Sequence, residues 1–284
     1  MRSEWQRRRT ATNGVVLHTI GAGPENGPLV ILLHGFPEFW LAWRRQIGPI
    51  AAAGLRVLVP DQRGYNLSDK PPDIAHYRLD TLTADVLGLA DALGRKQFAV
   101  VGHDWGAAVA WQLAAKHPER ISRAAVLNAP HPAVLRSYLC HPSQLAKSWY
   151  MGFFQVPMLP EAILSAGGFA MLARTLRRSS LPGTFSETDL QRYRDAWRQP
   201  DALTAMLNWY RALRHDALTI AVPRVRVPVR IIWGDDDAFL NKGLADASGA
   251  ICDHCTIHHL PGFTHWVQHE ATVEVNRLLV EFLC

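Results

Sequence analysis

An aspartate flanked by two glycines is the residue in this sequence best suited to covalent chemistry. The stretch Gly102-His-Asp-Trp-Gly106 lies between an apolar run and a segment with helical spacing. It matches the nucleophile-elbow pattern, with Asp104 at the position that serine usually occupies. A turn this sharp strains its central residue and leaves room only for small flanking residues. The alternative is an aspartate that merely caps the helix, so partners elsewhere in the chain must decide.

Two later loops supply such partners. In proteins with a nucleophile elbow, an acid and then a histidine follow the nucleophile along the chain. The acidic loop contains Asp235, Asp236 and Asp237, which compete for the role of the acid. His265 is the best candidate among the 13 histidines because its loop, which opens with Pro-Gly262, follows the last strand-like run. The order of aspartate, acid and histidine supports a covalent catalyst.

An aspartate nucleophile restricts the electrophile. Serine attacking a saturated carbon would leave an ether, whereas aspartate leaves an ester that water can cleave at its carbonyl. His265 would activate that water as a general base, and the resulting oxyanion would need amide donors. We expect these donors at Trp105, after the nucleophile, and at Phe36 in the turn His34-Gly-Phe-Pro37. The electrophile is therefore expected to be an epoxide or an alkyl halide, not an acyl group.

Strand-like and helix-like segments alternate in a way that would bring these residues together. Apolar strand-like runs cover residues 15–20, 28–33, 55–60, 98–101, 121–128, 227–233 and 256–260. Helical spacing covers residues 40–53, 79–93, 107–116 and 271–283. This alternation predicts an α/β fold with a doubly wound, mostly parallel sheet.

The alternation is interrupted from about residue 132 to residue 221, where aromatic and arginine-rich helical stretches replace the strands. An insertion of about 90 residues is too long for an ordinary loop. It leaves the sheet where open α/β sheets bind their ligands. We therefore predict a core in two parts, residues 1–131 and 222–284, and a helical cap (lid) domain at residues 132–221.

Composition argues against several other classes of protein. With 48% hydrophobic and 19% charged residues the chain is an ordinary globular protein, and a net charge of +5 without a binding motif does not indicate nucleic acid. No stretch approaches the ~18 apolar residues of a membrane span. The cysteines and histidines at residues 252–259 form no complete zinc motif. We expect a cytoplasmic protein without metal or cofactor, and without a nucleic-acid or membrane partner.

The motifs together resemble those of the α/β-hydrolase-fold epoxide hydrolases, and the resemblance covers essentially the whole chain. The matching segments are His34-Gly-Phe-Pro37, Asp61-Gln-Arg-Gly-Tyr65 with Ser68, Gly102-His-Asp-Trp-Gly106, Asn128-Ala-Pro-His-Pro132, Gly234-Asp-Asp-Asp237 and His265-Trp266. The resemblance implies that Asp237 is the triad acid, with Asp235 second. It also implies a substrate pocket lined by His34, Pro37, Phe154 and Trp266.

Two cap segments favour an epoxide. Opening an epoxide generates an alkoxide, which needs a proton donor, and the resemblance assigns this role to Tyr150 and Tyr210, two of only six tyrosines. Ordinary aromatic packing is the alternative reading of both. The resulting prediction is an epoxide hydrolase that forms a vicinal diol from a small-molecule epoxide, as a monomer or homodimer.

The second candidate is a haloalkane or haloacid dehalogenase, because halide departs without a proton and the Trp105 indole could bind it. Dehalogenases of the fluoroacetate type usually carry arginine after the nucleophile, so Trp105 disfavours that subgroup. A binding-only protein, as in the hormone receptors of this fold, would have no use for a complete set of Asp104, His265 and Asp237.

Overall fold

Eight strands form one sheet that is parallel except at one edge. The computed structural model describes residues 5–216 and 224–284. The strand order is β1-β2-β4-β3-β5-β6-β7-β8, and β2 runs antiparallel to both β1 and β4. The strands are β1 (Gln6–Thr12), β2 (Val15–Ala22), β3 (Leu29–Leu33), β4 (Arg56–Pro60), β5 (Phe98–His103), β6 (Ile121–Leu127), β7 (Val229–Gly234) and β8 (Cys255–Leu260). The predicted doubly wound, mostly parallel sheet is thereby confirmed.

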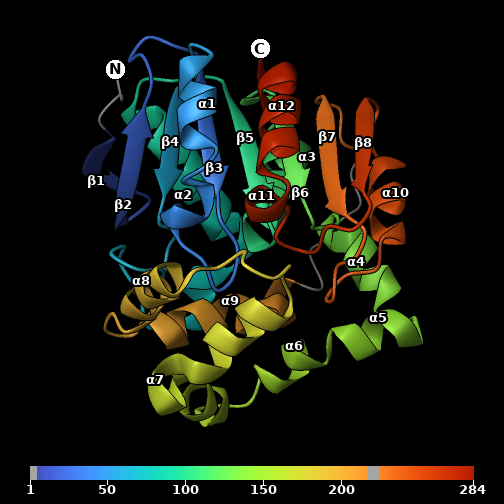
Figure 1. Ribbon diagram of the computed structural model, residues 1–284. Coiled ribbons are helices and arrows are strands. Elements are labelled where there is room, and N and C mark those ends of the chain that lie inside the picture. The colour runs from blue at the N-terminus through green and yellow to red at the C-terminus, as the bar shows by residue number, and fades with distance from the viewer. Residues whose placement is uncertain (1–4, 217–223) are drawn as a thin grey trace.

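Helices cover both faces of this sheet, because alternate strand residues face opposite sides. In β3, Val30 and Leu32 join the core beneath α1 (Ile47–Ala52) and α12 (Thr272–Leu283). Ile31 and Leu33 join the opposite core, and Figure 1 shows the two helical layers on either side of the sheet. The opposite layer holds α2 (Leu79–Ala92), α3 (Trp105–Lys116) and α10 (Gly243–Gly249).

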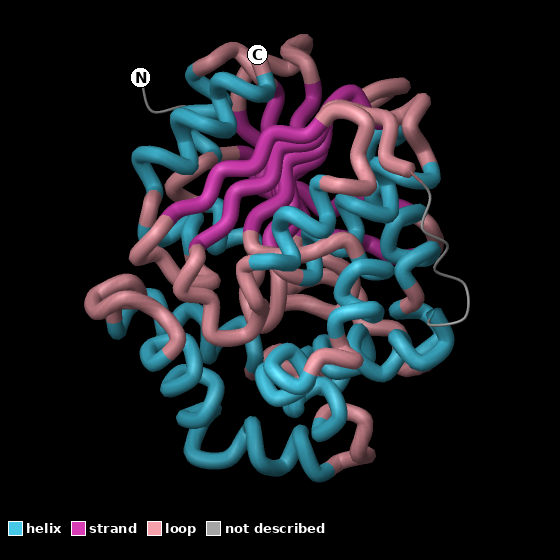
Figure 2. The backbone as a smooth tube through the Cα atoms, turned by 90° about the vertical axis from the view of Figure 1, so that its right-hand side faces the viewer, coloured by secondary structure: helices cyan, strands magenta, loops and turns pink. Residues whose placement is uncertain are grey.

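Six further helices follow β6 and lie beyond the carboxyl ends of the parallel strands (Figures 1 and 2). They are α4 (Pro132–Tyr138), α5 (Pro142–Lys147), α6 (Trp149–Phe153), α7 (Leu159–Arg178), α8 (Glu187–Trp197) and α9 (Ala202–Asp216). The helix α7 is broken at Ala166–Phe169, where the backbone leaves helical geometry. We propose that these helices form the cap domain predicted from the sequence. Its predicted boundary at 221/222 lies outside the described residues.

The sequence-based element assignments differ from the structure at several elements. Strand β1 was not predicted, since its residues are charged and exposed at the sheet edge. The helix predicted at residues 40–53 is a 3-10 turn, Trp40–Trp43, followed by α1. The last predicted helix, at residues 271–283, is α12, whereas α10 and the short helix α11 (Val267–Glu270) were not predicted. Within residues 5–216 and 224–284, no helix has the length and apolar character needed to cross a membrane.

Candidate active site

The turn between β5 and α3 holds Asp104 in a strained conformation. Its φ of 51° and ψ of −120° lie outside the regions that most residues adopt. A Cβ on Gly102 would lie 2.4 Å from the carbonyl oxygen of Gly106, and one on Gly106 would lie 2.1 Å from that of Leu33. The two glycines therefore let the backbone pass close enough to raise the Asp104 side chain above the sheet edge.

A buried histidine and a second carboxylate face Asp104. His265 Nε2 lies 3.6 Å from Asp104 Oδ2, while His265 Nδ1 lies 2.7 Å from Asp237 Oδ2. Asp104, Asp237 and His265 follow β5, β7 and β8, whose parallel carboxyl ends meet at one edge of the sheet. The structure thus brings the three residues singled out in the sequence into one line of contacts.

The electrostatics of this line favour an ion pair. Burial alone would lower the pKa of His265, but the charges and hydrogen bonds of Asp237 and Asp104 raise it to about 10. Burial would also raise the pKa of Asp237, and the contact with His265 outweighs this, holding the pKa below its usual range. The two carboxylates therefore favour the protonated form of His265 that lies between them.

The competition between the acids of the acidic loop has a clear geometric outcome. Asp235 Oδ1 lies 2.6 Å from His259 Nδ1, so the partner of Asp235 is His259. Asp237 Oδ1 accepts hydrogen bonds from the backbone amides of Phe239 and Leu240, at 2.7 and 3.0 Å. Its Oδ2 accepts a further bond, 2.8 Å long, from Asn128 Nδ2. These donors orient Asp237 toward His265 and keep it ionised.

One of the two predicted amide donors already contacts the carboxylate. The Phe36 amide donates to Asp104 Oδ1 at 2.8 Å. Trp105 is the first residue of α3, so its amide has no acceptor within the helix. Oδ1 thus faces a backbone donor, while Oδ2 faces His265. The two oxygens of one carboxylate have different surroundings.

The cap closes over Asp104 with two tyrosines. Two cavities, of about 460 and about 170 Å³, meet here, and Asp104, Tyr150 and Tyr210 line both of them. The two phenol rings lie edge to face with centroids 6.0 Å apart. Burial raises the pKa of Tyr150 and of Tyr210 well above the ordinary range, so both remain protonated donors. Two neutral tyrosines of the cap therefore line the cavities that hold Asp104.

Three of the four predicted pocket residues line the larger cavity, namely Pro37, Phe154 and Trp266. His34 does not line either cavity, which corrects the prediction. Its side chain is fully buried beneath the turn, where Nε2 accepts a 3.0 Å bond from the Gln62 amide. His34 therefore supports the loop that carries Phe36 and has no exposed edge for a ligand.

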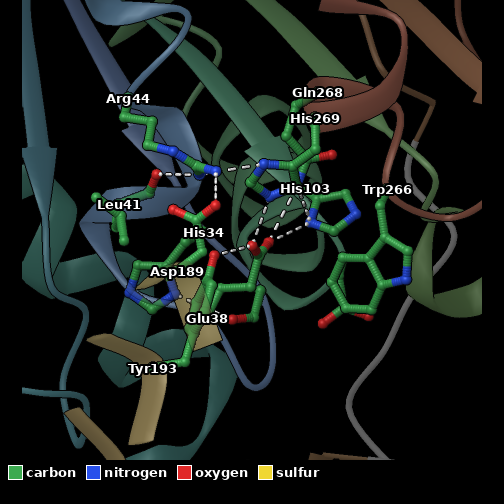
Figure 3. A network of polar contacts seen from close by, with 12 residues as sticks. His34, Glu38, Leu41, Arg44, His103, Asp189, Tyr193, Trp266, Gln268 and His269 are labelled. Carbon is green, nitrogen blue, oxygen red and sulfur yellow. Dashed lines mark hydrogen bonds and ion pairs between the residues drawn. The ribbon is translucent and has the colours of Figure 1, made fainter. Parts of the chain in front are cut away.

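A buried carboxylate that the sequence reasoning overlooked links the cap to the core. Glu38 is 1% exposed and accepts hydrogen bonds from Tyr193 of α8 at 2.6 Å and from His269 at 2.7 Å (Figure 3). Gln268 donates to its other oxygen at 3.0 Å, and His103 Nδ1 lies 3.3 Å away. Burial opposes the charge, but these partners, led by His269, hold the pKa of Glu38 well below its usual range.

This network reaches the site through the backbone of His265, whose carbonyl lies 2.9 Å from His103 Nε2. A largely buried ion pair, Arg44 and Asp189 at 3.2 Å, reinforces the contact between core and cap. The only signal in the sequence was an acidic residue directly after His34-Gly-Phe-Pro37, where sequence alone does not show burial.

Comparisons with known proteins identify the family of this chain. A family model described as the alpha/beta hydrolase fold matches residues 28–272. Epoxide hydrolase 4 of Mus musculus is 35% identical over 97% of this chain and 78% of its own length. The chain belongs to the α/β-hydrolase-fold epoxide hydrolase family. The fold, the resemblance and the prediction of a hydrolase enzyme are thereby confirmed.

Two further relatives extend the match over nearly the full length. The AB hydrolase superfamily protein YfhM of Bacillus subtilis (strain 168) is 46% identical, and the alignment covers 96% of each chain. The crystal structure of the Bacillus megaterium epoxide hydrolase in complex with an inhibitor superposes with a TM-score of 0.88 at 30% identity, covering 97% of this chain and 99% of the other.

Proposed function

We propose that this protein is an epoxide hydrolase that converts an epoxide and water to a vicinal diol through an ester on Asp104. The observation that carries the proposal is that Tyr150 and Tyr210 line the same two cavities as Asp104. A carboxylate facing two neutral phenols is suited to open a ring whose oxygen needs a proton. The family relatives named epoxide hydrolases support the same assignment.

In the first step Asp104 Oδ2 attacks a ring carbon while Tyr150 and Tyr210 hydrogen-bond the epoxide oxygen. The C–O bond of the ring breaks, the oxygen takes a proton, and an alkyl ester of Asp104 results. Because their pKa values are raised, both tyrosines begin this step protonated. The role of the cap is thus to supply the donors that an alkoxide leaving group requires.

In the second step water attacks the ester carbonyl carbon, and the chemistry depends on His265. Esterification removes the charge of Asp104, which is one of the two carboxylates that raise the pKa of His265. The pKa then falls, so His265 can lose its proton and become a general base, oriented by Asp237. Oδ1 receives the oxyanion charge, stabilised by the amides of Phe36 and Trp105. When the oxyanion collapses, the bond between the carbonyl carbon and Oδ2 breaks, and the departing oxygen takes the proton that His265 removed from water. The diol leaves, and the Asp104 carboxyl group ionises again, which restores the starting protonation of the site.

Dehalogenation is the second candidate, since the Trp105 side chain lines the smaller cavity beside Asp104. Both functions need the same nucleophile but differ in their need for a proton donor. Metal independence, a cytoplasmic location and a monomeric or homodimeric state remain predictions from the sequence.

The deciding experiment compares the wild type with a Tyr150→Phe/Tyr210→Phe double variant. Both are screened with styrene, aliphatic and terpene oxides and with chloro- and bromoalkanes, measuring diol and halide. We expect the wild type to form diol and the double variant to form it at least about 10³-fold more slowly. Halide release that survives in the double variant, without diol from any epoxide, would identify a dehalogenase.

A further inference from the structure

The outer side of the cap exposes an unusual number of large apolar side chains. We call this surface the cap rim and define it by the exposed side chains of residues 145–171. Of the nine large hydrophobic residues that are exposed in the described chain, six belong to the cap rim, with Met158 at 78% and Trp149 at 68%. The six are Leu145, Trp149, Val156, Met158, Leu159 and Met171. A concentration of exposed apolar side chains within one short segment is typical of an interaction surface.

The segment that forms the cap rim contains few charged residues. Residues 145–171 contain only two charged side chains, Lys147 and Glu161, and both are engaged with the protein. Lys147 Nζ donates to the carbonyl oxygens of Asp237 at 2.7 Å and Leu240 at 3.3 Å. Glu161 pairs with Arg211 at 2.7 Å. Within residues 145–171 both charges are thus held by the protein, and the charged side chains beside Met158 that belong to another segment are basic, namely Arg211 and Arg214 of α9.

The cap rim also lies where a flat partner could reach it. Its helices α5, α6 and α7 form the end of the molecule opposite the two chain termini (Figure 1). The view turned by 90° likewise shows helices and loops alone at that end (Figure 2). The sheet and its covering helices are set back, so they do not prevent the approach of an extended surface.

Basic side chains border the cap rim on α7. Met171, Arg174, Thr175 and Arg178 share one exposed face, at the spacing i, i+3, i+4 and i+7, while Leu172 on the other side is buried. This face changes from apolar to basic along the helix. An amphipathic surface with arginine at its border is the arrangement that lies in the interface of a bilayer with anionic headgroups.

The larger cavity opens within the cap rim. Trp149 and Met171 both line that cavity and are 68% and 47% exposed. A second copy of the chain seated on this surface would cover the opening, whereas a bilayer would place a reservoir of apolar molecules against it. We propose that the cap rim docks on an anionic lipid surface, so that apolar ligands enter the cavity directly from the bilayer.

A contact of this kind departs from the expectation of no membrane partner. That expectation rested on the lack of a long apolar stretch, which concerns spanning helices only. Peripheral docking uses short helices whose apolar side chains enter the interface while the backbone remains above it.

The test measures binding to vesicles without any epoxide, so its outcome is independent of the proposed catalytic function. Wild-type protein is floated with vesicles of phosphatidylcholine alone or with 30% phosphatidylglycerol. We expect binding to the anionic vesicles that is at least about tenfold stronger and weakens with salt. A Leu145→Asp/Met158→Asp variant, whose altered residues line neither cavity at Asp104, should lose it.

Val273→Asp is the matched control, because Val273 is 85% exposed but lies on α12, which packs on the sheet and is not part of the cap. The vesicle binding of this variant should equal that of the wild type. Replacing Arg174 and Arg178 by Gln should weaken binding to anionic vesicles about fivefold for each residue and leave binding to neutral vesicles unchanged. Thermal unfolding of each variant confirms that the fold is retained.

Three results would overturn the proposal. The first is a wild type that floats with neither kind of vesicle. The second is an equal loss of binding in Val273→Asp. The third is a concentration-dependent dimer, seen by sedimentation velocity in the wild type and absent from Leu145→Asp/Met158→Asp, without vesicle binding; the occupant of the cap rim would then be a second copy of the chain.

Discussion

Asp104 is fixed by its own backbone, whereas Tyr150 and Tyr210 are fixed by the rings packed around them. The elbow strains one residue, Asp104, between a buried strand and a helix. Backbone carbonyl groups pack so closely against the two flanking glycines that the turn has little room to move. Tyr210 instead packs edge to face on Trp105 and Phe36, with ring centroids 5.0 and 5.3 Å away. These are two ways of holding a functional group, one by covalent geometry and one by side-chain contact.

This difference indicates how well the elbow and the cap each tolerate substitutions. A backbone turn at the end of a buried strand transmits any misfit into the whole sheet. Aromatic packing between short helices yields more easily, because rings can shift without breaking a backbone hydrogen bond. We therefore expect core substitutions to change both stability and chemistry, and substitutions on the outer cap helices to change little.

The largest effect is expected where the core meets the chemistry. Asp104→Asn and His265→Gln should each lower diol formation by about 10⁴-fold or more. They should differ in mechanism, because only His265→Gln retains the nucleophile of the first step. Mass spectrometry should therefore detect a protein adduct with the mass of the epoxide in His265→Gln and none in Asp104→Asn.

Asp235→Asn serves as the control for this pair, since Asp235 contacts His259 and not His265. It should retain activity within a few fold of the wild type. Single turnover in heavy-oxygen water should label the carboxylate of Asp104; label in the diol on the first turnover would exclude the ester.

The next effect concerns the backbone of the elbow. In Gly106→Ala the new methyl group would lie 2.1 Å from the carbonyl oxygen of Leu33 and 2.6 Å from that of His34. Both are backbone atoms, so relief requires a shift of β3 or of the turn. We expect the free energy of unfolding to fall by about 2–4 kcal/mol, as measured by urea denaturation.

A matched glycine-to-alanine change outside the cap separates this clash from the general effect of adding a methyl group. Gly48 lies in α1, and a Cβ there would meet nothing within 4 Å. Gly48→Ala should therefore preserve or slightly raise stability. A loss equal to that of Gly106→Ala would mean that the elbow is not the constrained position.

A smaller effect follows from the charge of His265. Its pKa is raised from 6.5 to about 10 in the folded protein, so its protonated form stabilises the fold. This contribution is fully present below pH 6.5 and is lost as the pH rises through 10. Urea unfolding at pH 6, 8 and 10 should show a loss of a few kcal/mol in the wild type that is absent from His265→Gln.

His141→Gln provides the control for the pH series, because His141 is exposed on the cap. It should follow the wild-type curve. A parallel decline in His265→Gln would assign the loss to other groups and would remove the argument that Asp104 and Asp237 hold His265 protonated.

The same division explains what the sequence alone could predict. The elbow, the parallel sheet and the helical insertion depend on local periodicity and on the rule that parallel strands end at one edge, so they could be predicted. Strand β1 could not, because its pairing with β2 stabilises charged residues that carry no strand pattern. The burial of Glu38 depends on α8, more than 140 residues later in the chain.

Side-chain direction was equally beyond the sequence. The acidic loop offered three neighbouring carboxylates, and only the position of His259 shows that Asp235 is engaged elsewhere. His34 belongs to a matching motif, yet its ring serves the Gln62 amide beneath the turn. Motifs predict which residues gather at the sheet edge, but the contacts of each side chain depend on partners that the motif does not contain.

The smallest effect sharpens the comparison from the side of the cap. Gly152 is exposed in α6, and a Cβ there would meet nothing within 4 Å. Gly152→Ala should raise the free energy of unfolding by about 0.5–1 kcal/mol, because alanine loses less backbone entropy in a helix. Differential scanning calorimetry should show a higher melting temperature with unchanged diol formation. A loss of activity instead would show that α6 must bend during turnover, so that the cap depends on its backbone as much as the elbow does.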